Sequence, residues 1–175
     1  MAKELGVNNF EIQWAVTIQL QRFAFPTTFT IHFFIGDPPA DPSSWPAAPN
    51  LIGSHSQFIA ANLSLLLPQS FPSGLQQGEL SLTHTLAAGV SRGLLRDLTP
   101  ASVLPLLTEH LNWRARAADG CEIKVDLLAD LSIAVGSRQV QLAASENEFP
   151  IYGERQYHVE ATQGKRGGFG NRLRS

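Results

Sequence analysis

Residues 10–35, FEIQWAVTIQLQRFAFPTTFTIHFFI, decide the fold class because apolar and polar side chains alternate along them. From Phe10 to Leu20 every second residue is apolar, and glutamine and threonine fill most positions between. In residues 27–35 the apolar side chains Phe29, Ile31, Phe33 and Ile35 share one face, opposite Thr30, His32 and Phe34. Alternation with a period of two predicts β-strands that each bury one face. The short link FAFPT between them predicts a hairpin.

The remaining sequence predicts more short strands and one helix. Residues 51–60 weakly indicate a further strand, and residues 78–86 alternate again. Two further hairpins are expected to turn at Asp119-Gly120 and Gly136-Ser137. Thr99 and Pro100 are typical of a helix start, and leucines follow at helical spacing. No strand–helix–strand rhythm is present. We therefore expect a mainly β fold, an antiparallel β-sandwich of about seven or more strands with one short helix.

The composition of the 175 residues predicts one domain with a tail. A chain that is 43% hydrophobic can bury a substantial core. We expect residues 1–162 to form a single β-sandwich domain. Residues 163–175 are basic and glycine-rich, and are predicted to be a flexible tail.

Charge and cysteine content exclude several classes of protein. A net charge of −2 without a basic stripe argues against nucleic acid as a partner. The chain has no apolar run long enough for a membrane helix, MAKELGVNNF has acid and amide residues where a secretory signal would have an apolar run, and Cys121 is the single cysteine. A cytoplasmic protein without membrane or nucleic-acid partners is therefore expected. Cys121 is interpreted as a structural thiol.

Residues 23–78 are nearly free of charge. They contain no lysine or arginine, and their only acids are Asp37 and Asp41, yet they hold eight of the 11 prolines and seven of the 10 phenylalanines. Such a segment is either core or a surface that another protein covers. Five of these prolines lie in residues 36–50, which predicts an extended surface loop with Trp45 as its anchor.

The sequence offers no evident catalytic or metal site. None of the five histidines has a partner at the spacing that helical metal ligands require, and nucleophile and phosphate-loop motifs are absent. We interpret His32 and His84 as structural residues on strands, and His110 as favourable to the dipole at a helix end. The chain is therefore not expected to be an enzyme on its own or to bind a metal. The other histidines are His55 and His158.

Several motifs, in this order, resemble the C-terminal region of fungal tyrosinases, which follows their copper-binding helical core. The similarity extends from about Phe10 to Gly168 and includes a helix-and-strand segment, LTPASVLPLLTEHLNWR, and a Tyr-Gly ending, FPIYGERQYHVEATQGKRGG. The leading motifs are Trp14, Phe33-Phe34-Ile35-Gly36, Asp41-Pro42-Ser43-Ser44-Trp45 and Pro49-Asn50-Leu51-Ile52-Gly53-Ser54.

The resemblance implies a role without catalysis. In that family two copper ions, held by six histidines, oxidise phenols and catechols to quinones on the route to melanin, and that core is absent here. The implied function is a domain that shields or escorts the binuclear copper site of a tyrosinase core, in cis or in trans, and keeps it latent until proteolysis. Copper is then implied in the partner core and not in this chain. The family's Cys-x-x-Cys pair is missing from AANLSLLLPQSFPSG, which argues against copper delivery.

Phe58, in SQFIA, best matches the aromatic side chain that the family inserts into the substrate pocket. Trp45 and Phe34 are predicted to join Phe58 in contacting the partner. The alternative for Phe58 is that it fills the core of its own domain.

Other functions are also open from the sequence. The chain could be a free-standing β-sandwich module without an oxidase partner, in which Trp45 and neighbouring aromatic rings stack on sugars or phenolics. Copper binding by His32, His55 or His84, brought together in three dimensions, and a purely structural role are further alternatives.

Overall fold

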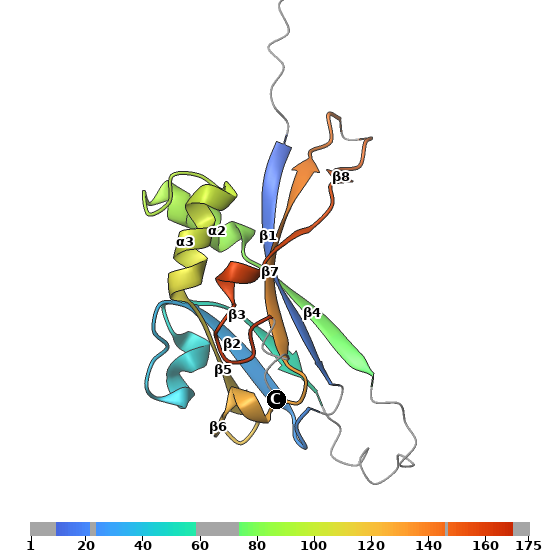
Figure 1. Ribbon diagram of the computed structural model, residues 1–175. Helices are drawn as coiled ribbons and strands as arrows, with labels where there is room; N and C mark the ends of the chain where they lie inside the picture. The colour runs from blue at the N-terminus through green and yellow to red at the C-terminus, as the bar shows by residue number, and fades with distance from the viewer. Residues whose placement is uncertain (1–9, 22–23, 59–73, 146, 170–175) are drawn as a thin grey trace, which may run out of the picture.

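The computed structural model describes residues 10–21, 24–58, 74–145 and 147–169, which form two antiparallel β-sheets (Figure 1). In the first sheet the order is β4-β1-β7-β8, and β9 also pairs with β7. In the second sheet the order is β3-β2-β5-β6. The predicted fold class, a mainly β antiparallel sandwich, is confirmed. The strands are β1 (Phe10–Gln21), β2 (Phe29–Ile35), β3 (Leu51–Gln57), β4 (Leu75–Ser81), β5 (Leu111–Ala117), β6 (Glu122–Ile123), β7 (Ser132–Gln141), β8 (Ile151–Tyr152) and β9 (Gln156–His158).

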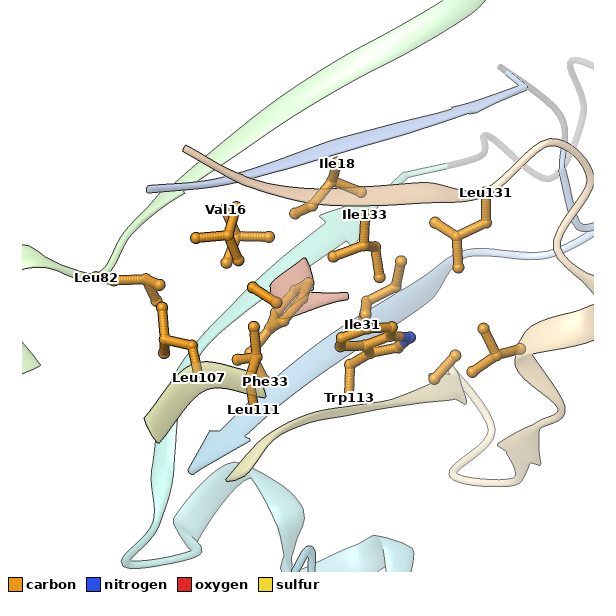
Figure 2. Close-up of a cluster of buried hydrophobic side chains, with 14 of the residues drawn as sticks. Val16, Ile18, Ile31, Phe33, Leu82, Leu107, Leu111, Trp113, Leu131 and Ile133 are labelled. Atoms are coloured by element: carbon orange, nitrogen blue, oxygen red, sulfur yellow. The ribbon is translucent and has the colours of Figure 1, made fainter. Parts of the chain in front are cut away.

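The core lies between the sheets, where the sequence alternation places the apolar faces. Val16 and Ile18 of β1 face Ile31 and Phe33 of β2 across it, and all four side chains are fully buried (Figure 2). Other core residues from the sheets are Trp14, Leu20, Phe29, Leu111, Trp113, Ala115, Ile123, Ile133 and Val135.

The expected hairpin between the first two strands is wrong. β1 pairs with β4 and β7, whereas β2 pairs with β3 and β5, so the link between β1 and β2 crosses from one sheet to the other. The physical reason is that both strands have an apolar face. When the two strands lie on opposite sides of the core, their apolar faces bury one another. This burial outweighs the closeness in sequence that favours a hairpin.

Only one of the two later hairpins is present. The turn at Asp119-Gly120 is confirmed, since Gly120 has a φ of +94° and β5 pairs with β6. Gly136-Ser137 lies instead inside the continuous strand β7. A Cβ at Gly136 would lie 2.8 Å from Cδ of Arg155, so this glycine allows a side chain to cross the strand closely and does not form a turn.

The structure contains two α-helices in its described part where one was predicted. Helix α3 (Pro100–His110) is confirmed, with Thr99 at the N-cap position, although the Thr99 side chain makes no capping bond. Helix α2 (Thr83–Ser91) replaces the end of the expected strand at residues 78–86. Leu82 and Leu86 are both buried, and a spacing of four residues fits one face of a strand as well as one face of a helix. Three short 3-10 helices complete the elements: η1 (Pro42–Ala47), η2 (Val125–Leu127) and η3 (Val159–Ala161).

Residues 163–169 are bound to the domain, so the prediction of a flexible tail from residue 163 is wrong for this part. The Lys165 ammonium donates hydrogen bonds to the backbone carbonyls of Leu107 and Leu111, at 3.0 and 2.8 Å, and thereby caps the end of α3. The indole of Trp113 donates to the carbonyl of Arg166 at 2.9 Å. The Lys165 side chain thus caps the helix, and the backbone at Arg166 is held against the core residue Trp113. Residues 170–175 lie outside the described part.

Candidate functional site

Phe58 directly follows β3 and exposes 82% of its surface. The alternative that it fills the core of this domain is therefore wrong. An exposed phenylalanine gains free energy when another surface covers it, because apolar area then leaves water. Phe58 is available for contact with a partner.

The strand that leads to Phe58, β3, lies against the edge strand of the other sheet. β3 is the edge strand of the second sheet and β4 the edge strand of the first. They contact each other through glycines: a Cβ on Gly78 would lie 2.4 Å from the His55 ring, and one on Gly53 would lie 2.5 Å from the Leu80 side chain. Close approach of this kind is possible only where the side chain is a hydrogen atom.

The contact between the edge strands β3 and β4 is called the seam below. A polar contact completes it at the end nearest Phe58. The side-chain amide of Gln57 donates a hydrogen bond to the Gln76 side-chain oxygen, and Gln57 is 8% exposed. Phe58 therefore follows the point at which β3 and β4 contact each other. Residues 59–73, which include most of the stretch that lacks the Cys-x-x-Cys pair, lie outside the described residues.

The strands beside Phe58 carry little charge. Between Asp41 and Glu79 the chain contains no acid, lysine or arginine. The one titratable ring on the seam is His55, whose pKa lies below its ordinary value because burial disfavours the charged form. A partner can cover this region without desolvating fixed charges.

Trp45 and Phe34 are not available to a partner in this structure. Trp45 is 2% exposed, packs edge-to-face against Phe34 at 6.2 Å, and donates its indole hydrogen to the Pro39 carbonyl at 2.7 Å. The proline-rich loop folds back as η1 and covers the outer face of the second sheet, including Phe34 and His32. The prediction that these two rings contact a partner is therefore contradicted, as is a stacking site built on Trp45. The aromatic outer face of β2 avoids charge because its own loop buries it.

The histidines do not meet in one place. His32 lies on the outer face of β2, where Nδ1 is 2.8 Å from the Ser54 hydroxyl; burial and, secondarily, Arg116 lower its pKa. His55 lies at the seam, and His84 is exposed on α2, not on a strand. These three therefore do not form a copper site. Among the described residues no group of three or more potential ligands could hold a metal ion. His110 does lie in the last turn of α3 as predicted.

One polar feature of the outer face of the first sheet was missed by the sequence reasoning. Arg155, which crosses Gly136, binds Glu79 of β4 with two hydrogen bonds of 2.7 and 2.9 Å. The pair lines an open groove of about 460 Å³ together with Arg138 and Gln13. A glycine in the middle of an apolar strand, followed by an arginine in a later segment, is the only sequence signal for this contact. Glu11 also lines the groove, so two acids and two arginines are present and neither sign of charge is in excess to select a ligand.

Comparison with known proteins agrees with the resemblance seen in the sequence. Residues 13–135 match the family described as the tyrosinase C-terminal domain. A tyrosinase of Neurospora crassa is 28% identical over 173 residues, covering 96% of this chain and 25% of the relative.

Two solved structures of mushroom tyrosinase share the fold. One, of the recombinant enzyme, has a TM-score of 0.53 and 18% identity and covers 82% of this chain and 25% of its own. The other, a crystal containing both latent and active enzyme, has a TM-score of 0.54 and 19% identity and covers 85% of this chain and 26% of its own. The chain thus spans about a quarter of the length of these relatives. Within its described residues, none of the helices has the length and apolar character needed to cross a membrane.

Proposed function

Because this chain belongs to the tyrosinase C-terminal domain family, we propose that it is a non-catalytic domain that covers the binuclear copper site of a tyrosinase-like oxidase core. Phe58 is the side chain that enters the substrate pocket of that core and excludes phenols and catechols. The observation that supports this role is the 82% exposure of Phe58 directly after β3, whose last residue, Gln57, is buried.

The physical basis is the burial of one aromatic ring. Transfer of a phenylalanine side chain from water to an apolar pocket yields about 1.5–3 kcal/mol, which is about 10- to 100-fold in affinity. A phenol has a similar ring and competes for the same space. The gain is largest when the domain is held against the core, either as part of the same chain or through an interface of its own.

The proposal places copper in the partner and leaves this chain without a metal. The partner is a tyrosinase-like core, in cis or in trans, whose products lead to melanin, and we place the pair in the cytoplasm. Mushroom tyrosinase, which shares the fold, occurs in latent and active forms. A domain of this kind accounts for latency by covering the site until proteolysis removes it.

The test is inhibition in trans. The purified chain is mixed with an activated fungal tyrosinase core, and the rate of diphenol oxidation is measured against the concentration of the chain. We expect inhibition, and for Phe58→Ala an inhibition constant raised about 10- to 100-fold.

Phe149→Ala is the matched control, because Phe149 is a phenylalanine that is 91% exposed just before β8, far from Phe58 in the sequence. Its inhibition constant is expected to equal that of the unmodified chain. Absence of inhibition at high micromolar concentration, or equal effects of the two substitutions, would refute the proposal.

A further inference from the structure

We propose that Gly78 and His55 are positioning residues for Phe58, and that the fit of the His55 ring onto Gly78 sets where Phe58 meets its partner. This inference rests on the proposed function, since it concerns how the same side chain is presented. The contact joins the edge strands of the two sheets and involves neither the core cluster nor the groove around Arg155.

The seam between β3 and β4 consists of three pairs that interlock by size. In the first pair Gly53 of β3 receives Leu80, and in the second Gly78 of β4 receives His55. In the third, the glutamines 57 and 76 share a hydrogen bond. The glycine thus alternates between the strands. A slide of two residues, the repeat that keeps side chains on the same face, would bring large side chains against one another. The pairs therefore specify one register.

The register of β3 against β4 also fixes the position of Phe58, because Phe58 is adjacent to the last pair. Gln57 forms the last pair and is buried, and Cα of Phe58 is about 3.8 Å from Cα of Gln57, the spacing of adjacent residues. In the described part of the chain β3 forms sheet hydrogen bonds with β2 alone, so β4 supplies its support on the other side. Displacement of β3 at His55 therefore moves Phe58. A gap of 0.5–1 Å between two packed surfaces already forfeits about a quarter to a half of their attraction.

The experiment adds and then removes bulk at the second pair. In the inhibition assay, Gly78→Ala is expected to raise the inhibition constant about tenfold, because its Cβ would lie 2.4–3.0 Å from three atoms of the His55 ring. The double variant His55→Ala/Gly78→Ala removes that collision and is expected to return the inhibition constant to within about threefold of the unmodified chain.

Two comparisons separate positioning from stability. Gly89→Ala in α2 is the matched control, since its Cβ would meet only the Leu95 side chain, at 3.4 Å, and we expect unchanged inhibition. In a Phe58→Ala background, Gly78→Ala is expected to leave the residual inhibition unchanged, because there is no ring left to misplace. If Gly78→Ala prevents folding, His55→Ala alone, which creates no collision, tests the same contact and is expected to raise the inhibition constant several-fold.

The failures of the two proposals are distinguishable. If Phe58→Ala weakens inhibition but Gly78→Ala and His55→Ala do not, positioning by the seam is overturned and the proposed function stands. Equal effects of Gly78→Ala with and without Phe58 would also overturn it, since the seam would then act independently of the ring. If the unmodified chain does not inhibit, the proposed function itself is wrong.

Discussion

Replacing Trp45 by alanine is expected to destabilise the domain strongly, whereas replacing Phe58 by alanine is expected to leave its stability almost unchanged. Trp45 packs the proline-rich loop onto the outer face of β2 and has 2% of its surface exposed, whereas Phe58 is 82% exposed. Both residues belong to the charge-poor part of the sequence, and the sequence alone does not show that one is buried and the other exposed. The structure assigns one to the interior of the domain and the other to its surface.

The expected magnitudes follow from burial. Truncation of a buried tryptophan to alanine costs about 3–5 kcal/mol, and Trp45 also loses its hydrogen bond to Pro39 and its edge contact with Phe34. In a domain of this size 1 kcal/mol corresponds to about 2–4 °C in Tm, so Trp45→Ala should lower Tm by about 6–20 °C. Phe58→Ala should change the free energy of unfolding by less than about 0.5 kcal/mol.

The assay is urea unfolding followed by far-ultraviolet circular dichroism, which does not depend on the tryptophan that is removed. Trp45→Phe serves as a second variant, because it retains an aromatic ring but lacks the indole donor; a loss of about 1–2 kcal/mol is expected. A loss below about 1 kcal/mol for Trp45→Ala would show that the loop is not packed on the sheet. A loss above about 2 kcal/mol for Phe58→Ala would show that its ring is buried, and would refute the reasoning behind both proposals.

Three further predictions concern charge. Lys165→Met should lower the free energy of unfolding by about 1–2 kcal/mol, because the carbonyls at the end of α3 lose a charged donor. If the variant is as stable in urea as the unmodified chain, this cap is not formed. The hydrogen bonds from Arg155 hold the pKa of Glu79 below its ordinary 4.5, so their contribution is present above that pH and is lost as the pH falls below it. Since Glu79 is half exposed, Glu79→Gln should remove at most about 1 kcal/mol of pH-dependent stability between pH 6 and pH 3. Urea titrations in which the variant and the unmodified chain lose stability in parallel over this range would contradict the prediction. Burial lowers the pKa of His32 and His55, so below about pH 6.5 the unfolded chain binds protons that the folded chain does not, and the free energy of unfolding should fall as the pH falls. In the double variant His32→Gln/His55→Gln this free energy should change less between pH 7 and pH 5. The same change in the variant and the unmodified chain would argue against buried, neutral rings.

Much of the local structure could be predicted from the sequence. The alternation in residues 10–20 and 29–35 identified the buried faces of β1 and β2, and the signals at Thr99 and Pro100 identified the start of α3. These features depend on neighbouring residues only. Where a pattern fits two periods, as at Leu82 and Leu86, the same reasoning placed a strand where a helix begins.

The candidate site could be predicted only in part. Phe58 was named from a resemblance, but its exposure could not be read from the sequence, because SQFIA fits a buried strand equally well. The sequence does not show that Trp45 and Phe34 are buried within the domain, because a face without charge has the same composition whether another protein or its own loop covers it. The close approach of His55 to Gly78 has no sequence signal beyond an isolated glycine.

The sequence by itself determined that this protein is a β-sandwich domain of the tyrosinase C-terminal family, since periodicity and motif order are carried along the chain. Tertiary structure alone decided that β1 and β2 lie in different sheets, that the loop around Trp45 closes over the outer face of β2, and that Phe58 is left exposed beside the β3–β4 seam. The physical reason is that alternation specifies which side chains share a face of a strand. Which surface covers that face depends on contacts between residues far apart in the chain, such as Glu79 with Arg155, whose energies no local pattern records.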